Sequence, residues 1–162
     1  MPTAKLRVLV VDDNRDGADA LGLLAEELGH QVHVTYGGIT ALDVARTFRP
    51  NLMLIDLAMP DMDGCSLVKQ VRNSPAFAHT KLVAITGHAD QGHKTLAIRA
   101  GFETVLFKPV ALTEFKAALA SVVPVLLEHQ PGRPAQPASL AEQRFLPIDE
   151  ALASGMSANP KG

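Results

Sequence analysis

Short apolar runs alternate with longer segments of helical periodicity along most of the chain. Four of the runs are nearly continuous in apolar side chains, as expected of strands buried on both faces: Leu6–Val11, Leu52–Ile55, Leu82–Ile85 and Thr104–Phe107. A further run, Gln31–Tyr36, alternates polar with apolar residues, which predicts a strand at the edge of a sheet. Strands that alternate with helices are typical of an α/β protein, in which helices cover both faces of a doubly wound parallel sheet.

The segments between these runs carry apolar residues at helical spacing. The first predicted helix has one apolar stripe, formed by Leu21, Leu24, Ala25 and Leu28, and ends near Gly29. The same spacing predicts helices over 41–48, 66–72 and 91–100. A last helix is predicted to end or kink at Pro124 and to carry an apolar face made of Leu112, Phe115, Leu119 and Val122.

The composition changes towards the carboxyl terminus. The 162 residues suit one domain of ordinary size with a remainder, and 47% hydrophobic residues are enough for a globular core. From Gln130 onward prolines become frequent and no segment could bury a core of its own. We therefore predict a domain over residues 1–129 and a Pro-rich tail over 130–162 that is disordered or docks on a partner.

Charge and cysteine content narrow the class of protein. A formal net charge of −2 argues against a basic nucleic-acid-binding module and against recruitment to an anionic membrane. One cysteine, Cys65, rules out an intramolecular disulfide and suits a reducing compartment. No stretch approaches the roughly 18 apolar residues of a membrane span, and no signal peptide is visible. We expect a cytoplasmic protein that binds neither nucleic acid nor membrane.

Polar side chains follow the predicted strands where those strands end. Asp12 and Asp13 follow the first strand, Asp56 closes the third, Thr86 closes the fourth and Lys108 follows the fifth. The carboxyl ends of parallel strands meet at one edge of the sheet, where ligands usually bind. Three carboxylates so close together resist ionisation unless a cation lies among them. Oxygen ligands of this kind favour a hard divalent ion such as Mg²⁺.

Other polar residues have simpler explanations. Asp61 and Asp63 stand beside proline and glycine and are predicted to be turn residues that do not bind the metal. Cys65 is predicted to fill a small space at a helix start. His88 and His93 are five residues apart and do not share a helical face, so no metal site is expected there.

Four short motifs resemble the receiver domain of bacterial two-component response regulators, the CheY-like family. They are Val10–Asn14, Leu54–Gly64, Ala84–Gly87 and Phe107–Pro109, and they occur in the family's order at the predicted strand ends. The resemblance covers about residues 5 to 124. It implies a flavodoxin-like (βα)5 fold with the strand order 2-1-3-4-5.

The resemblance also implies a role for each residue at the carboxyl edge. Asp56 would be the nucleophile that accepts a phosphoryl group. Asp12, Asp13, Asp56 and the backbone carbonyl of Ala58 would hold Mg²⁺. Lys108 would pair with one phosphoryl oxygen, and the Thr86 hydroxyl would donate to another.

Three further positions follow from the same resemblance. Gly87 would leave the approach to the phosphoryl group open. A cis peptide is expected between Lys108 and Pro109. Val105 is a departure, because the family commonly has an aromatic ring three residues before the lysine.

The function expected from this resemblance is that of a single-domain response regulator. Its partners would be a sensor histidine kinase or phosphotransfer protein and a downstream protein target, and it would act as a monomer or weak dimer. It would catalyse only its own phosphorylation and slow dephosphorylation, and would not be an enzyme in the usual sense. A tail of this length is too short for an output domain.

Four alternatives stay open at this point. The chain could be a receiver-like binding module that works without phosphorylation, although the acidic pair and the lysine count against this. It could be the receiver part of a hybrid histidine kinase, although Met1 lies only five residues before the first strand. A phosphohydrolase with Asp56 as nucleophile is disfavoured because Ala58 stands where such enzymes generally have a second aspartate. A dinucleotide-binding enzyme is disfavoured because no Gly-rich turn follows the first strand.

Overall fold

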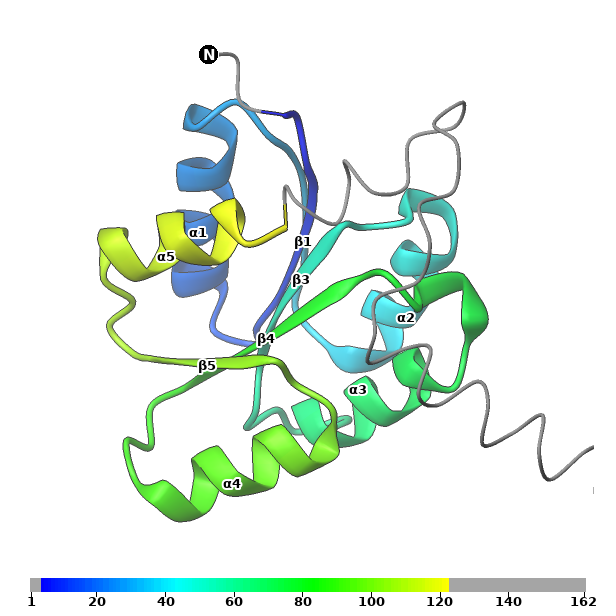
Figure 1. The fold of residues 1–162 in the computed structure, drawn as a ribbon, viewed down its shortest axis with the longest axis vertical. Helices are drawn as coiled ribbons and strands as arrows, with labels where there is room; N and C mark the ends of the chain where they lie inside the picture. The colour runs from blue at the N-terminus through cyan, green and yellow to red at the C-terminus, as the bar shows by residue number, and fades with distance from the viewer. Residues whose placement is uncertain (1–3, 123–162) are drawn as a thin grey trace, which may run out of the picture. The chain divides into compact units, whose positions relative to one another are not determined.

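The computed structural model describes residues 4–122, which form one parallel sheet with helices on both faces (Figure 1). Along the sheet the strands follow the order β2-β1-β3-β4-β5, as predicted. Their bounds are β1 Arg7–Val11, β2 Gln31–Thr35, β3 Leu52–Asp56, β4 Lys81–Thr86 and β5 Thr104–Phe107. Within this described part of the chain, no helix has the length and apolar character needed to cross a bilayer.

The helices lie in two layers, one on each face of the sheet (Figure 1). Their bounds are α1 Arg15–Glu27, α2 Gly38–Phe48, α3 Gly64–Arg72, α4 Gln91–Ala100 and α5 Leu112–Ala120, with a short 3-10 helix at Pro75–Phe77. Helices α1 and α5 cover one face of the sheet and share a core with it. Helices α2, α3 and α4 cover the opposite face around a second core.

Alternation along the central strands supplies both cores. In β1, Val8 and Val10 point to the layer of α1 and α5, whereas Leu9 and Val11 point to the layer of α2 to α4. All five residues of β3 are buried, as expected of a central strand with helices on both faces. The edge position of β2, predicted from its alternating sequence, is confirmed.

The structure corrects two sequence predictions. Strand β5 is not buried on both faces, because it lies at the second edge of the sheet and pairs with β4 alone; of its four residues, only Leu106 is buried. Leu112 does not belong to the apolar face of α5, since 48% of its surface is exposed, whereas Phe115, Leu119 and Val122 are buried. Leu112 is the first residue of α5, so its side chain lies at the start of the helix. The predicted tail and Pro124 lie outside the described residues.

Candidate functional site

Three carboxylates meet at the carboxyl edge of the sheet. Asp12 directly follows β1, where its backbone N–H donates to the Thr35 carbonyl at 3.1 Å, and Asp56 is the last residue of β3. Asp12, Asp13 and Asp56 each place a carboxylate oxygen within 4.8 Å of the others. The neighbouring strands β1 and β3 therefore bring the predicted acidic residues together.

The three carboxylates differ in their exposure to solvent. Asp12 and Asp56 are 1% and 4% exposed, whereas Asp13 is exposed. One oxygen of Asp12, Oδ1, accepts a hydrogen bond from the backbone N–H of Asn14 at 2.9 Å. Asn14 in turn caps α1, because its Oδ1 accepts from the N–H of Gly17. The start of α1 thus fixes the orientation of the buried Asp12 carboxylate.

Lys108 joins the two buried carboxylates. Its ammonium nitrogen lies 2.9 Å from Asp12 Oδ2 and 3.3 Å from Asp56 Oδ1. The peptide bond between Lys108 and Pro109 is cis, which confirms that prediction. The backbone N–H of Lys108 donates to the Thr86 carbonyl at 2.8 Å, so the lysine is placed by the end of β4.

The environment of Asp56 makes its carboxylate harder to ionise. Burial and the neighbouring charge of Asp12 raise the pKa of Asp56 from its ordinary value of 3.8 to about 6, although Lys108 acts in the opposite direction. Burial lowers the pKa of Lys108, but its contacts with Asp12 and Asp56 outweigh burial, so this pKa lies above its ordinary value. At neutral pH Asp56 is therefore ionised and Lys108 is charged.

Thr86 ends β4 and is buried, at the side of the site next to α4. Its Oγ1 accepts a hydrogen bond from the backbone N–H of His88 at 3.0 Å. A Cβ at Gly87 would meet no atom within 4 Å, so the space around this residue is open. Ala58 lies in the loop after β3 and lines the same cleft as Thr86.

Gly64 brings the start of α3 against the end of β3. A Cβ at this position would lie 2.6 Å from the carbonyl oxygen of Asp56 and 3.0 Å from Leu57 Cα. Both of these atoms belong to backbone, which has little freedom to move away. Gly64 is thus required by the close approach of the α3 N-terminus to Asp56.

Asp61 and Asp63, which we predict to be turn residues, do not belong to the group of Asp12, Asp13 and Asp56 and instead accept hydrogen bonds from backbone N–H groups. Asp63 caps α3 by accepting from the Ser66 N–H at 2.7 Å, and Asp61 accepts from the Ile39 N–H at 3.5 Å. Cys65 is the second residue of α3 and packs against the core. Burial, and then the charge of Asp63, raise the pKa of the Cys65 thiol, which disfavours the reactive thiolate.

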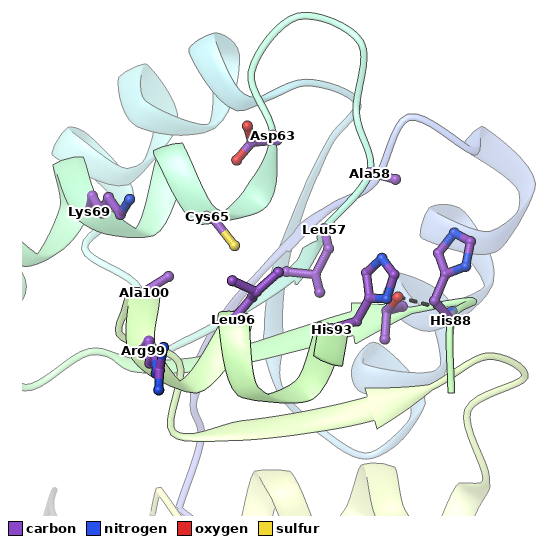
Figure 2. A pocket seen from close by; sticks show the side chains of 11 residues that line it. Leu57, Ala58, Asp63, Cys65, Lys69, His88, His93, Leu96, Arg99 and Ala100 are labelled. Carbon is purple, nitrogen blue, oxygen red and sulfur yellow. Dashed lines mark hydrogen bonds between the residues drawn. The ribbon is translucent and has the colours of Figure 1, made fainter. Parts of the chain in front are cut away.

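A cleft of about 460 Å³ opens between α3, α4 and the loop after β3 (Figure 2). Its lining includes Thr86, Ala58 and Cys65, and also His88 and His93. The spacing of the two histidines in the sequence gives no reason to expect them together, yet both line this cleft. His88 precedes α4 and belongs to a loop, so helical spacing does not govern its position, and its ring stacks on that of His93 at 4.7 Å between centroids.

A five-stranded parallel sheet of this order, with three carboxylates and a lysine at its carboxyl edge, defines an α/β domain of the receiver class. The chain matches the response regulator receiver domain family over residues 8–120, and it belongs to that family. The resemblance seen in the four motifs is therefore confirmed.

Individual relatives agree with this assignment. The chain is 29% identical to the polar-differentiation response regulator DivK of Brucella anthropi over 70% of its own length and 93% of that protein. It is 36% identical to an uncharacterized protein of Leptolyngbya boryana, over 66% of this chain and 82% of the other. Among solved structures, the chemotaxis protein CheY4 of Vibrio cholerae superposes with a TM-score of 0.69 at 26% identity, covering 74% of this chain and 99% of that one.

Proposed function

We propose that this receiver domain accepts a phosphoryl group on Asp56 from a histidine kinase or phosphotransfer protein and passes the signal on through altered protein contacts. The observation that carries the proposal is the position of Lys108, whose ammonium lies within 3.3 Å of the Asp56 carboxylate and 2.9 Å of Asp12. A buried carboxylate at a strand end, beside a fixed cation and two further carboxylates, is suited to nucleophilic attack on a phosphoryl group.

The donor set at this edge fits Mg²⁺. Asp12, Asp13 and Asp56 supply hard oxygen ligands within 4.8 Å of one another, and the backbone carbonyl of Ala58 would complete the protein ligands. Three carboxylates and one ammonium carry a formal charge of −2, which one divalent ion balances. When bound, Mg²⁺ supplies positive charge to the phosphoryl oxygens and helps to align the transfer.

The residues of the chain have separate parts in the transfer. An oxygen of the ionised Asp56 attacks the phosphorus of a phosphohistidine, so that an O–P bond forms while the N–P bond breaks and its electron pair stays on the imidazole nitrogen. Lys108 pairs with a phosphoryl oxygen as charge builds up there. The Thr86 hydroxyl donates to another phosphoryl oxygen. Its proton is available for this, because in this structure Thr86 Oγ1 accepts a hydrogen bond from the backbone N–H of His88.

Incubation with a small phosphodonor tests this proposal directly. With Mg²⁺ and acetyl phosphate we expect the intact mass to increase by one phosphoryl group, and with excess chelator we expect no increase. Mass spectrometry of the intact chain gives the result. An unchanged mass in Mg²⁺, in a protein that is folded, would favour the alternative of a binding module that works without phosphorylation.

The phosphohydrolase alternative is tested in the same samples. Release of inorganic phosphate from added phosphate monoesters, at a rate above that of the buffer, would support it. We expect no such release, because the chain has Ala58 two residues after the nucleophile.

Thr86 is expected to carry the response to phosphorylation, since the family's usual aromatic position is occupied by Val105. Val105 is partly buried against the core and, being β-branched, has few rotamers to change. We expect Thr86→Ala to weaken strongly the amide shifts that beryllofluoride and Mg²⁺ cause over residues 86–100, and Val105→Ala to change them only mildly. Two-dimensional NMR measures both. A response that survives Thr86→Ala but is lost in Val105→Ala would contradict this account.

A further inference from the structure

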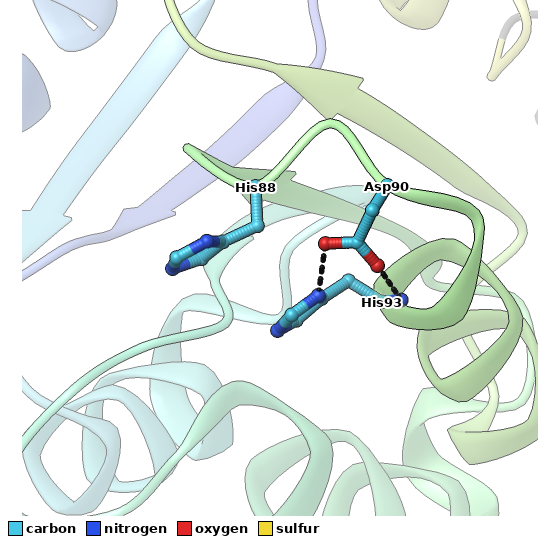
Figure 3. A group of neighbouring side chains, drawn as sticks. All are labelled: His88, Asp90 and His93. Atoms are coloured by element: carbon cyan, nitrogen blue, oxygen red, sulfur yellow. Dashed lines mark hydrogen bonds and ion pairs between the residues drawn. The ribbon is translucent and has the colours of Figure 1, made fainter.

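Two imidazoles and a carboxylate stand together where the chain enters α4 (Figure 3). His88, Asp90 and His93 each offer a donor atom within 4.8 Å of the other two. The rings of His88 and His93 stack at 4.7 Å with an angle of 13° between their planes. This group lies outside the acidic cluster of Asp12, Asp13 and Asp56, and the proposed phosphoryl transfer does not use it.

Asp90 holds His93 in place. As the cap of α4, its Oδ1 accepts the backbone N–H of His93 at 2.9 Å, while its Oδ2 lies 2.6 Å from His93 Nδ1 (Figure 3). The carboxylate and the imidazole are thus already paired, and both depend on the start of the same helix. His88 reaches the group from the loop that precedes Asp90.

We propose that His88, Asp90 and His93 form a binding site for a divalent transition metal ion of the zinc and cobalt type. Imidazole nitrogen together with carboxylate oxygen is a donor set that such ions prefer, whereas Mg²⁺ prefers oxygen alone. The site and the acidic cluster therefore differ in the ion that each selects. Water would take the fourth position, because both histidines border the open cleft in front of α4.

The distances allow such a site with small movements. Donor atoms around a tetrahedral zinc ion, each bound at about 2.0–2.1 Å, lie about 3.3 Å from one another. The donors here lie within 4.8 Å of one another, so no pair needs to approach by more than about 1.5 Å on binding. Rotation of the His88 and His93 side chains, which are not buried, can supply this change without moving the core.

The site is connected to Thr86 by a single hydrogen bond. The backbone N–H of His88 donates to Thr86 Oγ1 at 3.0 Å, so an ion that fixes His88 also favours the present position of Thr86. This step rests on the proposed function, in which Thr86 moves towards the phosphoryl group. Since linkage is reciprocal, occupation of the phosphoryl site should weaken binding of the transition metal.

Cobalt titration of the whole chain in excess Mg²⁺ tests the site itself. We expect one equivalent of Co²⁺ to bind with the visible absorption of a tetrahedral ion, and His88→Gln or His93→Gln to weaken binding by more than about tenfold. His33→Gln is the matched control, because His33 is exposed on β2 and contacts Phe48. Circular dichroism checks that each variant is folded.

Two results would overturn the proposed metal site. One is an equal Co²⁺ affinity in the wild type and in folded His88→Gln and His93→Gln proteins. The other is loss of Co²⁺ binding in Asp12→Asn with no loss in the histidine variants, which would place the ion in the acidic cluster.

Beryllofluoride tests the connection to Thr86. We expect beryllofluoride, added in the presence of Mg²⁺, to weaken Co²⁺ binding to the wild type at least about fivefold. The Co²⁺ affinity of Asp56→Asn should be the same with and without beryllofluoride. Unchanged affinity in a wild-type protein whose amide shifts show bound beryllofluoride would refute the connection and leave the metal site standing. Absence of any beryllofluoride-induced shift would instead count against the proposed function.

Discussion

Replacement of Asp56 by asparagine is expected to abolish phosphorylation by acetyl phosphate completely. An amide oxygen is a poor nucleophile, and the variant also removes one of the three carboxylates that would hold Mg²⁺. The fold should survive, because an Asn side chain has nearly the same size and can still contact Lys108. Intact mass spectrometry after incubation with Mg²⁺ and phosphodonor measures the outcome.

Asp63→Asn is the matched control for this experiment. Asp63 also follows β3 and carries a carboxylate, but it caps α3 and lies outside the acidic cluster. Asparagine is as good a helix cap as aspartate, so this variant should be phosphorylated like the wild type. Full phosphorylation of Asp56→Asn would show that another side chain is the acceptor.

The same substitution is expected to stabilise the protein in the absence of metal, by an amount that depends on pH. The pKa of Asp56 is about 6 in the folded chain, against an ordinary value of 3.8. Well below pH 3.8 the group is protonated in both the folded and the unfolded state, so its effect on the free energy of unfolding vanishes. As pH rises from about 4 to 6, the unfolded chain loses its proton first, and the free energy of unfolding falls.

Above pH 6 the folded chain carries the full cost of the ionised Asp56. A shift of this size corresponds to about 3 kcal/mol. We therefore expect the free energy of unfolding of Asp56→Asn to exceed that of the wild type by up to about 3 kcal/mol at pH 7.5 in chelator, and by less than about 1 kcal/mol near pH 4. Circular dichroism suits this measurement because the chain has no tryptophan.

Magnesium should narrow the difference in stability between the two proteins at neutral pH. An ion that binds only the folded wild type contributes about 2.7 kcal/mol at roughly 100 times its Kd, and it should contribute less in Asp56→Asn. A stability difference between the variants that is equal at pH 4 and pH 7.5 would be incompatible with the raised pKa of Asp56. Identical unfolding with and without Mg²⁺ would argue against the proposed metal site.

The fold could be predicted from the sequence because a local pattern of apolar and polar residues marks most of its strands and helices. The continuous apolar run Leu52–Ile55 predicts a strand with helices on both faces, and the structure has it at the centre of the sheet. Gln31–Thr35 alternates and lies at an edge. The prediction that β5 is buried on both faces was wrong because its apolar sequence resembles that of a central strand. Its burial depends instead on its position in the sheet, where it has a neighbouring strand on one side only.

The acidic site could be predicted for a related reason. In a parallel sheet, residues at different strand ends become neighbours whatever their separation in sequence, so Asp12 and Asp56 were expected to meet. The arrangement of His88 beside His93 could not be read in this way. It depends on the path of a short loop between Thr86 and Asp90, and no periodicity describes such a path.

Lys108 has one more consequence, which concerns how tightly an ion can be held. Its ammonium already occupies the space between Asp12 and Asp56, so it acts as an internal competitor of any ion that enters the acidic cluster. The apparent affinity for such an ion would then be the intrinsic affinity multiplied by the fraction of molecules in which the ammonium has moved off Asp12. An ion bound here would be held less tightly than by the three carboxylates alone, and the lysine would keep part of their charge balanced once the ion has left.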